Sequence, residues 1–382
     1  MARTKVAKNI AYDDQRQRYY VTFHYGNGVK STKTYTAKAD AVKALKQFEA
    51  DKANEEVVEP AKESFGEWMR YWLENISRPN VRATTYHGYK NLVERHLIPA
   101  MGSKPLQKVT AADIREYYKK KLSGPKTLSQ NTLRKHHDVL NQILQAAVLE
   151  DKLRKNPMRI VAAPKKESIQ YTIYTAEELS ELFEKVKGDR IEIVVKLAGY
   201  YGLRREEICG LMWQDIDFQK NVFEIRRSMT MAGGQLLIDE PKTKASYRKE
   251  ALNDDVRELL LSLQTQQAEN KRMLTDDYMD TGFVLCWEDG KPYRPNYISE
   301  LFTKFLADNG LKKIRLHDLR HSFASIANDL GVPMFDISKV LGHGSTSVTS
   351  GIYTHMFDDS HKETIDRVTE AIQQFQKKVK AK

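Results

Sequence analysis

The stretch LHDLRHSFASIANDLGVPMFDISKVLGHGSTSVTSGIYTH, residues 316–355, holds most of the chemically informative residues of this chain. His317 and Arg320 stand three apart, so on a helix their side chains lie on one face and reach the same anion. His343 follows in a Leu-Gly-His turn, and Tyr353 comes ten residues later. The stretch therefore combines imidazole, guanidinium and phenol groups.

Two helices are expected inside this stretch. Apolar residues recur at helical spacing over 323–330, which predicts the first helix. Gly331 followed by Pro333 is typical of a helix end and a new start. A second short helix is expected over 336–341, which places His343 just past a helix end.

These groups suit phosphate chemistry. Arginine presents a planar donor fork that fits two phosphate oxygens and stays charged at any working pH. Imidazole donates to a phosphate oxygen or moves a proton near neutrality. A tyrosine hydroxyl, with a free pKa of about 10, becomes a better nucleophile beside cations that favour its phenolate. The set favours tyrosine attack on a phosphodiester, although a His and an Arg at this spacing are also typical of an ordinary helix surface.

A second informative segment, AGYYGLRREEICGLMWQDID, spans residues 198–217. Its apolar residues predict a partly buried helix that begins near Arg204. A charged side chain among apolar neighbours needs an anionic partner. Glu207, three residues on, is one candidate and a substrate phosphate is the other. We favour the phosphate, with Glu207 fixing the helix rather than Arg204.

One further cation, Lys242, lies in a Pro-Lys-Thr sequence between two β-like runs at 221–231 and 247–252. A lysine at such a hairpin turn is normally solvated. Lys242 is a candidate functional residue only because the other residues of the pattern accompany it.

Together these residues resemble the tyrosine recombinase (phage integrase) family, whose ordered signature is Arg, hairpin Lys, His-x-x-Arg, His or Trp, and Tyr. All six positions are present in order: Arg204, Lys242, His317, Arg320, His343 and Tyr353. The flanking words GLRxxE, LxWxDID and LGH agree, and the resemblance is strongest over residues 170–360. The likeness is to integrases of conjugative transposons and temperate phages that carry an N-terminal arm-binding domain.

The resemblance implies an activity, a set of partners and the absence of a cofactor. The activity is that of a site-specific recombinase that cuts and rejoins duplex DNA through a 3′-phosphotyrosyl intermediate, with the six residues as its catalytic set. It would integrate and excise a mobile element or prophage. Neither a cofactor nor a metal is expected, because the covalent intermediate stores the bond energy. The implied partners are duplex DNA at core-type and arm-type sites, a homotetramer on DNA, an excisionase and a host DNA-bending protein.

Length and composition are consistent with a DNA-binding protein of several domains. The 382 residues suggest two or three domains. No apolar run approaches the ~18–20 residues of a membrane span, and the N-terminus lacks the apolar stretch of a secretory signal. Cys209 and Cys286 are interpreted as core residues of a cytoplasmic protein, not as a disulfide or a metal site.

The net charge of +11 is unevenly distributed. Residues 1–48 hold 10 Lys and Arg against 3 Asp and Glu, and residues 63–167 hold 20 against 10. Residues 168–382 hold 30 against 33. Long-range attraction to phosphate is therefore expected from the part upstream of the catalytic motifs.

Residues 1–56 are predicted to form an arm-type DNA-binding domain. Alternation over 8–37 with a turn at 26–28 predicts a three-stranded sheet, and 36–53 a helix. A β-sheet fits the major groove; an extra packing module is the alternative. Alternate strand residues point to opposite faces, so which candidates read bases stays open. The candidate contacts are Arg16, Arg18, Tyr20, Lys30 and Lys33.

Residues 57–165 are predicted to form a helical domain that resembles the family's core-binding domain. An acidic linker is expected at 54–63 and a loop at 98–102. The aromatic stripe between 65 and 73 is interpreted as core rather than as a base-stacking surface. Helices are expected at 65–75, 84–96, 111–122 and 131–150. Candidate phosphate contacts near helix starts are Thr84, Thr85, Tyr86, Lys90, Asn131, Thr132, Arg134 and Lys135.

Residues 170–382 are predicted to form a mixed, mostly α-helical catalytic domain that ends in a tail helix over 362–382. The whole chain is thus expected to be mainly α with small β elements. In the family such tails commonly dock on a neighbouring protomer, and packing on the tail's own domain is the alternative.

Three other functions are compared with this interpretation. A type IB topoisomerase uses the same motifs but reseals the original strand, and the two upstream domains favour a recombinase. A DNA-binding regulator without strand exchange is disfavoured by the six intact residues. A metal-dependent nuclease needs carboxylate clusters that the sequence lacks, and a cation site at His317 and His321 is disfavoured by the adjacent Arg320.

Overall fold

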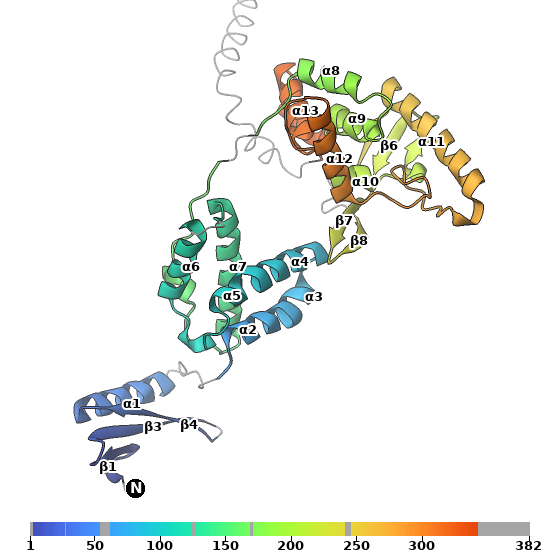
Figure 1. Cartoon of the computed structure of the whole chain (residues 1–382). Coiled ribbons are helices and arrows are strands. Elements are labelled where there is room, and N and C mark those ends of the chain that lie inside the picture. Colours follow the sequence, from blue (N-terminus) through green and yellow to red (C-terminus); the bar gives the residue numbers. More distant parts are fainter. Residues whose placement is uncertain are drawn as a thin grey trace, which may run out of the picture. The chain divides into compact units, whose positions relative to one another are not determined.

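The computed structural model describes residues 3–26, 28–53, 62–123, 127–168, 171–240 and 246–342. Lys242, His343, Tyr353 and the expected tail helix over 362–382 lie outside the described residues. The chain divides into two compact units, Met1–Ile169 and Gln170–Lys382 (Figure 1). In the described part of the first unit, buried apolar residues form two separate clusters. The finer division into three domains stays a prediction.

The N-terminal module is an antiparallel sheet with a helix on one face. In sheet order its strands are β1 Thr4–Ala7, β2 Ile10–Asp13, β3 Arg18–Gly26 and β4 Val29–Tyr35, and α1 Lys38–Ala53 follows. Ile10, Val21 and Phe23 of the sheet pack in one cluster with Leu45 of α1. The sheet has four strands where three were expected. Asn9, with a φ of 64°, turns the chain tightly enough for β1 to pair with β2.

The second module of the first unit is built from helices around an aromatic core. Its elements are α2 Phe65–Tyr71, η1 Trp72–Ser77, α3 Arg78–Asn80, α4 Ala83–Leu92, η2 Val93–Leu97, α5 Ile98–Met101, η3 Leu106–Lys108, α6 Ala111–Ser123, α7 Gln130–Leu149 and η4 Pro157–Ile160. The aromatic stripe of α2 and η1 is core, as predicted. Trp68 is fully buried, and its Nε1 donates to the carbonyl of Ile143 at 3.0 Å.

Two local features explain how these helices begin. A capping box starts α2, because the Ser64 hydroxyl accepts from the Glu67 amide while the Glu67 carboxylate accepts from the Ser64 amide. The loop expected at 98–102 is wrong, since Ile98–Met101 is helical. Pro99 is tolerated there because it lies in the first turn of α5, where its missing N–H is not needed.

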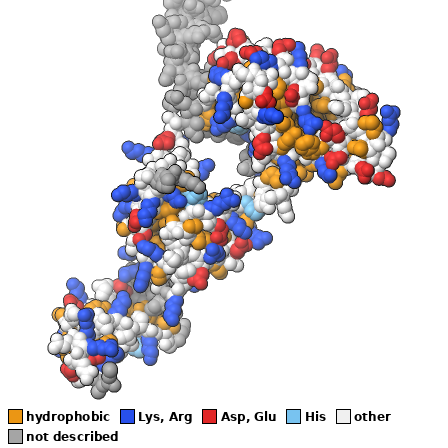
Figure 2. All heavy atoms as spheres, viewed as in Figure 1, with side chains coloured by type: hydrophobic (Ala, Val, Ile, Leu, Met, Phe, Trp, Pro, Cys, Tyr) orange, Lys and Arg blue, Asp and Glu red, His pale blue; other side chains and the backbone are white. Residues whose placement is uncertain are grey.

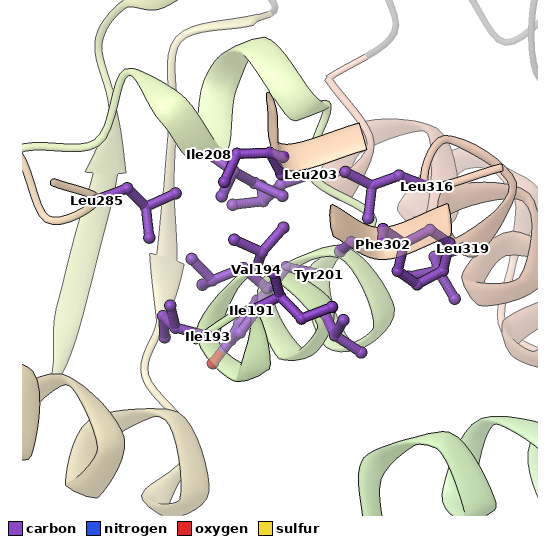
Figure 3. Packing of buried hydrophobic residues seen from close by; sticks show 14 of the residues in the cluster. Ile191, Ile193, Val194, Tyr201, Leu203, Ile208, Leu285, Phe302, Leu316 and Leu319 are labelled. Atoms are coloured by element: carbon purple, nitrogen blue, oxygen red, sulfur yellow. The ribbon is translucent and has the colours of Figure 1, made fainter. Parts of the chain in front are cut away.

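The second unit packs its helices around α9. Its elements are α8 Ala176–Lys185, α9 Glu192–Tyr201, α10 Arg205–Cys209, η5 Trp213–Asp215, β5 Ile216–Asp217, β6 Val222–Ile225, β7 Ser228–Ala232, β8 Gln235–Asp239, β9 Arg248–Ala251, α11 Asp254–Leu274, η7 Thr275–Asp277, α12 Pro295–Asp308, α13 Asp318–Asp329 and α14 Met334–Val340. Helix α9 is buried along almost its whole length. Figure 3 shows Val194 of α9 among apolar side chains that include Ile208, Phe302 and Leu316.

The β elements of the second unit form two small sheets. One has the order β5-β6-β9 and the other pairs β7 with β8. The run expected as one strand at 221–231 is therefore two strands with different partners. Of the described residues, none forms a helix long and apolar enough to cross a bilayer.

Candidate active site and nucleic-acid interface

Arg320 is held from two sides by main-chain carbonyls. It lies in the first turn of α13 with its side chain buried. Its Nη1 donates to the carbonyl of Gly202 at 2.6 Å, and its Nη2 donates to the carbonyl of Leu341 at 2.6 Å. Charge-assisted bonds to two separate segments fix the plane of the guanidinium. The end of α9, α13 and the residue after α14 are thereby joined at one cation.

Gly202 is required at this junction by its conformation and by its neighbours. It ends α9 in the left-handed region with a φ of 59°. A Cβ built on it would lie 2.5 Å from Leu341 Cδ2 and 3.1 Å from Phe323 Cδ1. Only glycine adopts this backbone without strain and leaves room for these side chains.

Arg204 follows two residues later and begins α10 as its N-cap residue. Its Nη1 donates to Glu207 Oε1 at 2.6 Å, while its amide donates to Glu207 Oε2 at 3.0 Å. Glu207 therefore holds both the helix start and the arginine side chain. The expectation that it fixes the helix rather than Arg204 is wrong, because one carboxylate has oxygens for both. The Arg204 side chain stays 30% exposed, which leaves it accessible from solvent.

A second arginine, Arg248 of β9, also binds Glu207. Its Nη2 lies 2.9 Å from Glu207 Oε2 and its Nη1 3.3 Å from Glu207 Oε1. Although burial opposes ionisation of this carboxyl, Arg248 and Arg204 together lower its pKa to about 2. Sequence reasoning did not identify Arg248. The sequence carries no signal for it, because the burial of Glu207 and its need for a second cation become visible only in the structure.

His317 directly precedes α13 and lies near both arginines. Its ring meets the ring of His321 edge to face, with centroids 5.1 Å apart. Partial desolvation of the ring lowers the pKa of His317, and the cations Arg320 and Arg204 act in the same direction. His317 is therefore neutral near pH 7 and able to accept a proton.

His321 is a buried structural residue on the same helix. Its ring packs at a tilt against the ring of Tyr171, with centroids 4.2 Å apart, and burial lowers the pKa of His321 to about 4. Among the described residues, no three His, Cys, Asp or Glu side chains come together as metal ligands.

A cavity of about 350 Å³ opens beside His317. Its wall carries Arg205, paired with Glu206, and Arg315, paired with Asp318, and Ser299 and Thr303 of α12 bring hydroxyls. These are the groups that bind phosphate and sugar oxygens in proteins. Arg205 also donates to Ser299 Oγ at 2.9 Å, so the wall is cross-linked.

Three of the six candidate catalytic residues lie within the described part of the chain, and the structure brings them to one region. Arg320 binds the carbonyl of Gly202, two residues before Arg204, and His317 directly precedes the helix that carries Arg320. Lys242, His343 and Tyr353 lie outside the described residues, although Arg320 binds the carbonyl of Leu341 only two positions before His343. The roles of all six stay proposals.

The N-terminal candidates are divided between the faces of the sheet by its register. Val21 is buried under α1 and pairs with Lys33, so Lys33 lies on the helix side of the sheet; its side chain is exposed, with its Nζ 5.9 Å from the Phe23 ring centroid. Tyr20 lies on the other face, as do Arg18 and Lys30 by the same alternation. The Arg3 guanidinium lies 3.7 Å over the Tyr20 ring, adding charge to this open face. Arg16 lies in the turn before β3 and is exposed.

The helical module places its candidates in three different settings. Lys90 and Lys135 are exposed, and Thr84, Thr85 and Thr132 are half-buried near the starts of α4 and α7. Figure 2 shows Lys and Arg side chains spread over the visible face of this module.

The other three candidates in this module already have protein partners. Tyr86 is buried and its hydroxyl donates to Glu74 at 2.5 Å. Asn131 exchanges two hydrogen bonds with the backbone of Glu167, and Arg134 donates to the carbonyl of Pro164 at 3.0 Å. Asn131 and Arg134 thus hold the segment that leaves the module, and Tyr86 is unsuited to the phosphate contact expected of it.

Comparison with known proteins gives the family. Residues 172–360 match the phage integrase family, and residues 64–122 match the phage integrase N-terminal SAM-like domain; together they cover more than half of the chain. A protein described as tyrosine recombinase XerC-like, from Caldanaerobacter subterraneus subsp. tengcongensis, is 26% identical over 332 residues. The alignment covers 80% of this chain and 83% of that protein.

Solved structures share the fold. The Tn1549 transposon integrase in complex with a circular intermediate DNA has a TM-score of 0.67 at 22% identity, covering 80% of this chain and 99% of that one. A lambda integrase tetramer bound to a Holliday junction has a TM-score of 0.56 at 15% identity, covering 90% and 98%. The chain therefore shares the fold of these integrases. The chain belongs to the phage integrase family and is a tyrosine recombinase of the integrase type.

Proposed function

We propose that this protein is a site-specific recombinase that cuts duplex DNA by attack of Tyr353 on the scissile phosphate. The phenolic oxygen forms a 3′-phosphotyrosyl bond, and the bond from phosphorus to the 5′ oxygen breaks to leave a 5′-hydroxyl. The 5′-hydroxyl of a partner strand then reverses the step. The intermediate keeps the energy of the phosphodiester, so no nucleotide is consumed.

The observation that supports this proposal most is the locked arrangement of Arg320, Gly202 and Arg204. Both arginines are preorganised, so they stabilise the charge of a pentacovalent phosphate without reorganising during the reaction. His317, neutral near pH 7, accepts or orients the tyrosine proton. This assignment of roles agrees with the order of the residues in the sequence and with the geometry of the three described groups.

The remaining roles rest on the resemblance of the motifs. Lys242 protonates the leaving 5′ oxygen, and His343 supports the arginines on the non-bridging oxygens. Tyr353 is the only nucleophile that the proposal requires. The same six residues serve integration and excision, because the chemistry of cleavage and rejoining is symmetric.

The partners of the reaction are proposed from charge and from relatives. The basic first unit binds duplex DNA at arm-type sites through the open face of its sheet and at core-type sites through its helical module. Strand exchange between two duplexes takes four protomers, and lambda integrase has been seen as a tetramer on a Holliday junction. An excisionase and a host DNA-bending protein complete the set that the family resemblance implies.

The proposal is tested with a nicked suicide duplex that carries a candidate core site, incubated in EDTA with wild-type protein and Tyr353→Phe side by side. A covalent protein–DNA band from wild type alone is the expected result. A band that persists in Tyr353→Phe contradicts the assignment of the nucleophile. Binding without any covalent band supports a DNA-binding regulator instead, and failure to join the cleaved strand to a second duplex supports a topoisomerase.

A further inference from the structure

Arg248 is a buried cation outside the six-residue signature. Its side chain is 7% exposed and lies between two carboxylates, with Nη2 2.9 Å from Glu207 Oε2 and Nε 3.3 Å from Glu250 Oε1. Its Nη1 also donates to the carbonyl of Ser246 at 3.3 Å. Burying a guanidinium is costly unless it is paired and hydrogen-bonded. The buried charge of Arg248 is therefore stabilised by its bonds to Glu207 and to the residues at the start of β9.

The carboxylate of Glu207 is shared between Arg248 and Arg204. Of the described residues, only Glu207 is hydrogen-bonded to the Arg204 side chain. A carboxylate with no other cation would draw Arg204 inward and compete with a phosphate for it. With Arg248 bidentate on the same carboxylate, that negative charge is balanced by a second cation.

We propose that Arg248 is a positioning residue for DNA cleavage, which balances and orients Glu207 so that Arg204 stays directed toward the scissile phosphate. The inference rests on the proposed function. Arg248 does not touch the substrate and acts only through Glu207. Loss of Arg248 should therefore weaken the stabilisation that Arg204 gives to the negative charge on the non-bridging oxygens.

The same guanidinium also links two parts of the site that are far apart in the chain. Arg248 and Glu207 are 41 residues apart, and Arg248 binds Ser246, four positions after Lys242. Glu207, at the start of α10, and Ser246, just before β9, are thereby bound by one guanidinium.

The experiment compares cleavage of two suicide duplexes that differ at one atom. One carries a natural scissile phosphate, and the other a methylphosphonate, in which a methyl group replaces a non-bridging oxygen and removes its charge. Wild type, Arg204→Ala, Arg248→Met and Arg226→Met are measured on both. Arg226 is a matched control, because it is an exposed arginine of the same region that pairs with Glu224.

On the phosphate substrate we expect Arg248→Met to slow cleavage about 100-fold, equivalent to ~2.7 kcal/mol of transition-state stabilisation. On the methylphosphonate we expect a loss of less than about fivefold for both Arg248→Met and Arg204→Ala, because the charge they serve is gone. Arg226→Met stays within about twofold of wild type on both substrates. Gel-shift affinity and melting temperature of the same preparations show that each variant is folded.

A second variant, Glu207→Gln with Arg248→Met, removes the buried cation together with the nearer of its two carboxylate partners and is expected to fold more stably than Arg248→Met alone. It should recover about tenfold in cleavage of the phosphate substrate, since no carboxylate competes for Arg204. Equal losses on the two substrates, or no recovery in the double variant, overturn the positioning role. Wild-type protein that forms no covalent complex refutes the proposed function and this inference with it, whereas equal losses beside an active wild type refute this inference alone.

Discussion

Replacing Gly202 by alanine tests whether the junction between α9, α13 and α14 is as tightly built as its geometry indicates. A φ of 59° costs a residue with a side chain about 1 kcal/mol. The added Cβ would lie 2.5 Å from Leu341 Cδ2, and Leu341 is fully buried. Overpacking of this kind costs about 1–3 kcal/mol. We therefore expect the second unit to lose about 2–4 kcal/mol of stability.

The matched control is Gly310→Ala, because Gly310 has nearly the same φ, 63°, but nothing within 4 Å of a built Cβ. It should cost only the conformational term of about 1 kcal/mol. Hydrogen exchange of the α9 amides measures both variants within the intact chain, without assuming that its units unfold together. Cleavage by Gly202→Ala should also fall about 100-fold, because the carbonyl that holds Arg320 moves. Equal stability losses in the two variants would show that the junction has room and that this reasoning is wrong.

Three further predictions concern charge. Glu207 has a folded pKa of about 2 against an ordinary 4.5, so its stabilising effect is present above pH 4.5 and lost as pH falls toward 2; Glu207→Gln should flatten that part of the stability–pH curve. His136 is buried against the Tyr117 hydroxyl, and burial lowers its pKa to about 4. The helical module should therefore lose stability as pH falls from 6.5 to 4, which hydrogen exchange of the α7 amides measures. A His136→Gln variant that keeps this acid sensitivity would contradict the assignment. Arg18→Ala should weaken binding to arm-type DNA and reduce its salt dependence by about one counterion. Lys33→Ala, on the opposite side of the sheet, should leave the salt dependence unchanged in the same titration.

Helices were the most predictable part of this chain. The helix expected over 111–122 is α6, Ala111–Ser123, and the one expected over 131–150 is α7, Gln130–Leu149. Each buries one continuous face, and that face appears in the sequence as a 3.6-residue period. These helices could be predicted because the spacing of apolar residues over one or two helical turns is enough to indicate them.

Strand pairing was less predictable because its determinants are far apart in the sequence. The run 221–231 alternates like one strand, yet β6 pairs with β9 and β7 turns away to pair with β8. Only the partner strands decide where such a run divides. The fourth strand of the N-terminal sheet was missed for a related reason, since β1 depends on a left-handed turn at Asn9 that alternation does not reveal.

The candidate site shows the same limit at the level of single residues. Arg204, His317 and Arg320 could be proposed from their motifs, but Arg248 lies in the strand sequence Arg-Lys-Glu-Ala, where three charged residues in a row give no sign of which one is buried. Its burial depends on Glu207, 41 positions earlier. Spacing rules describe neighbours on one element and contain no information about such a pair.

The two anchors of Arg320 have a consequence for how sequences of this kind can diverge. Both are main-chain carbonyls, groups that every residue type supplies equally. Substitutions along α9 or α14 that preserve the helices therefore leave the hydrogen-bond acceptors of this arginine in place. Substitution of Gly202 should instead disturb this site, because the junction has room for a hydrogen atom there and not for a larger side chain. The identity of Leu341 is thus constrained by its packing and not by this hydrogen bond, whereas Gly202 is constrained by the conformation of the junction itself.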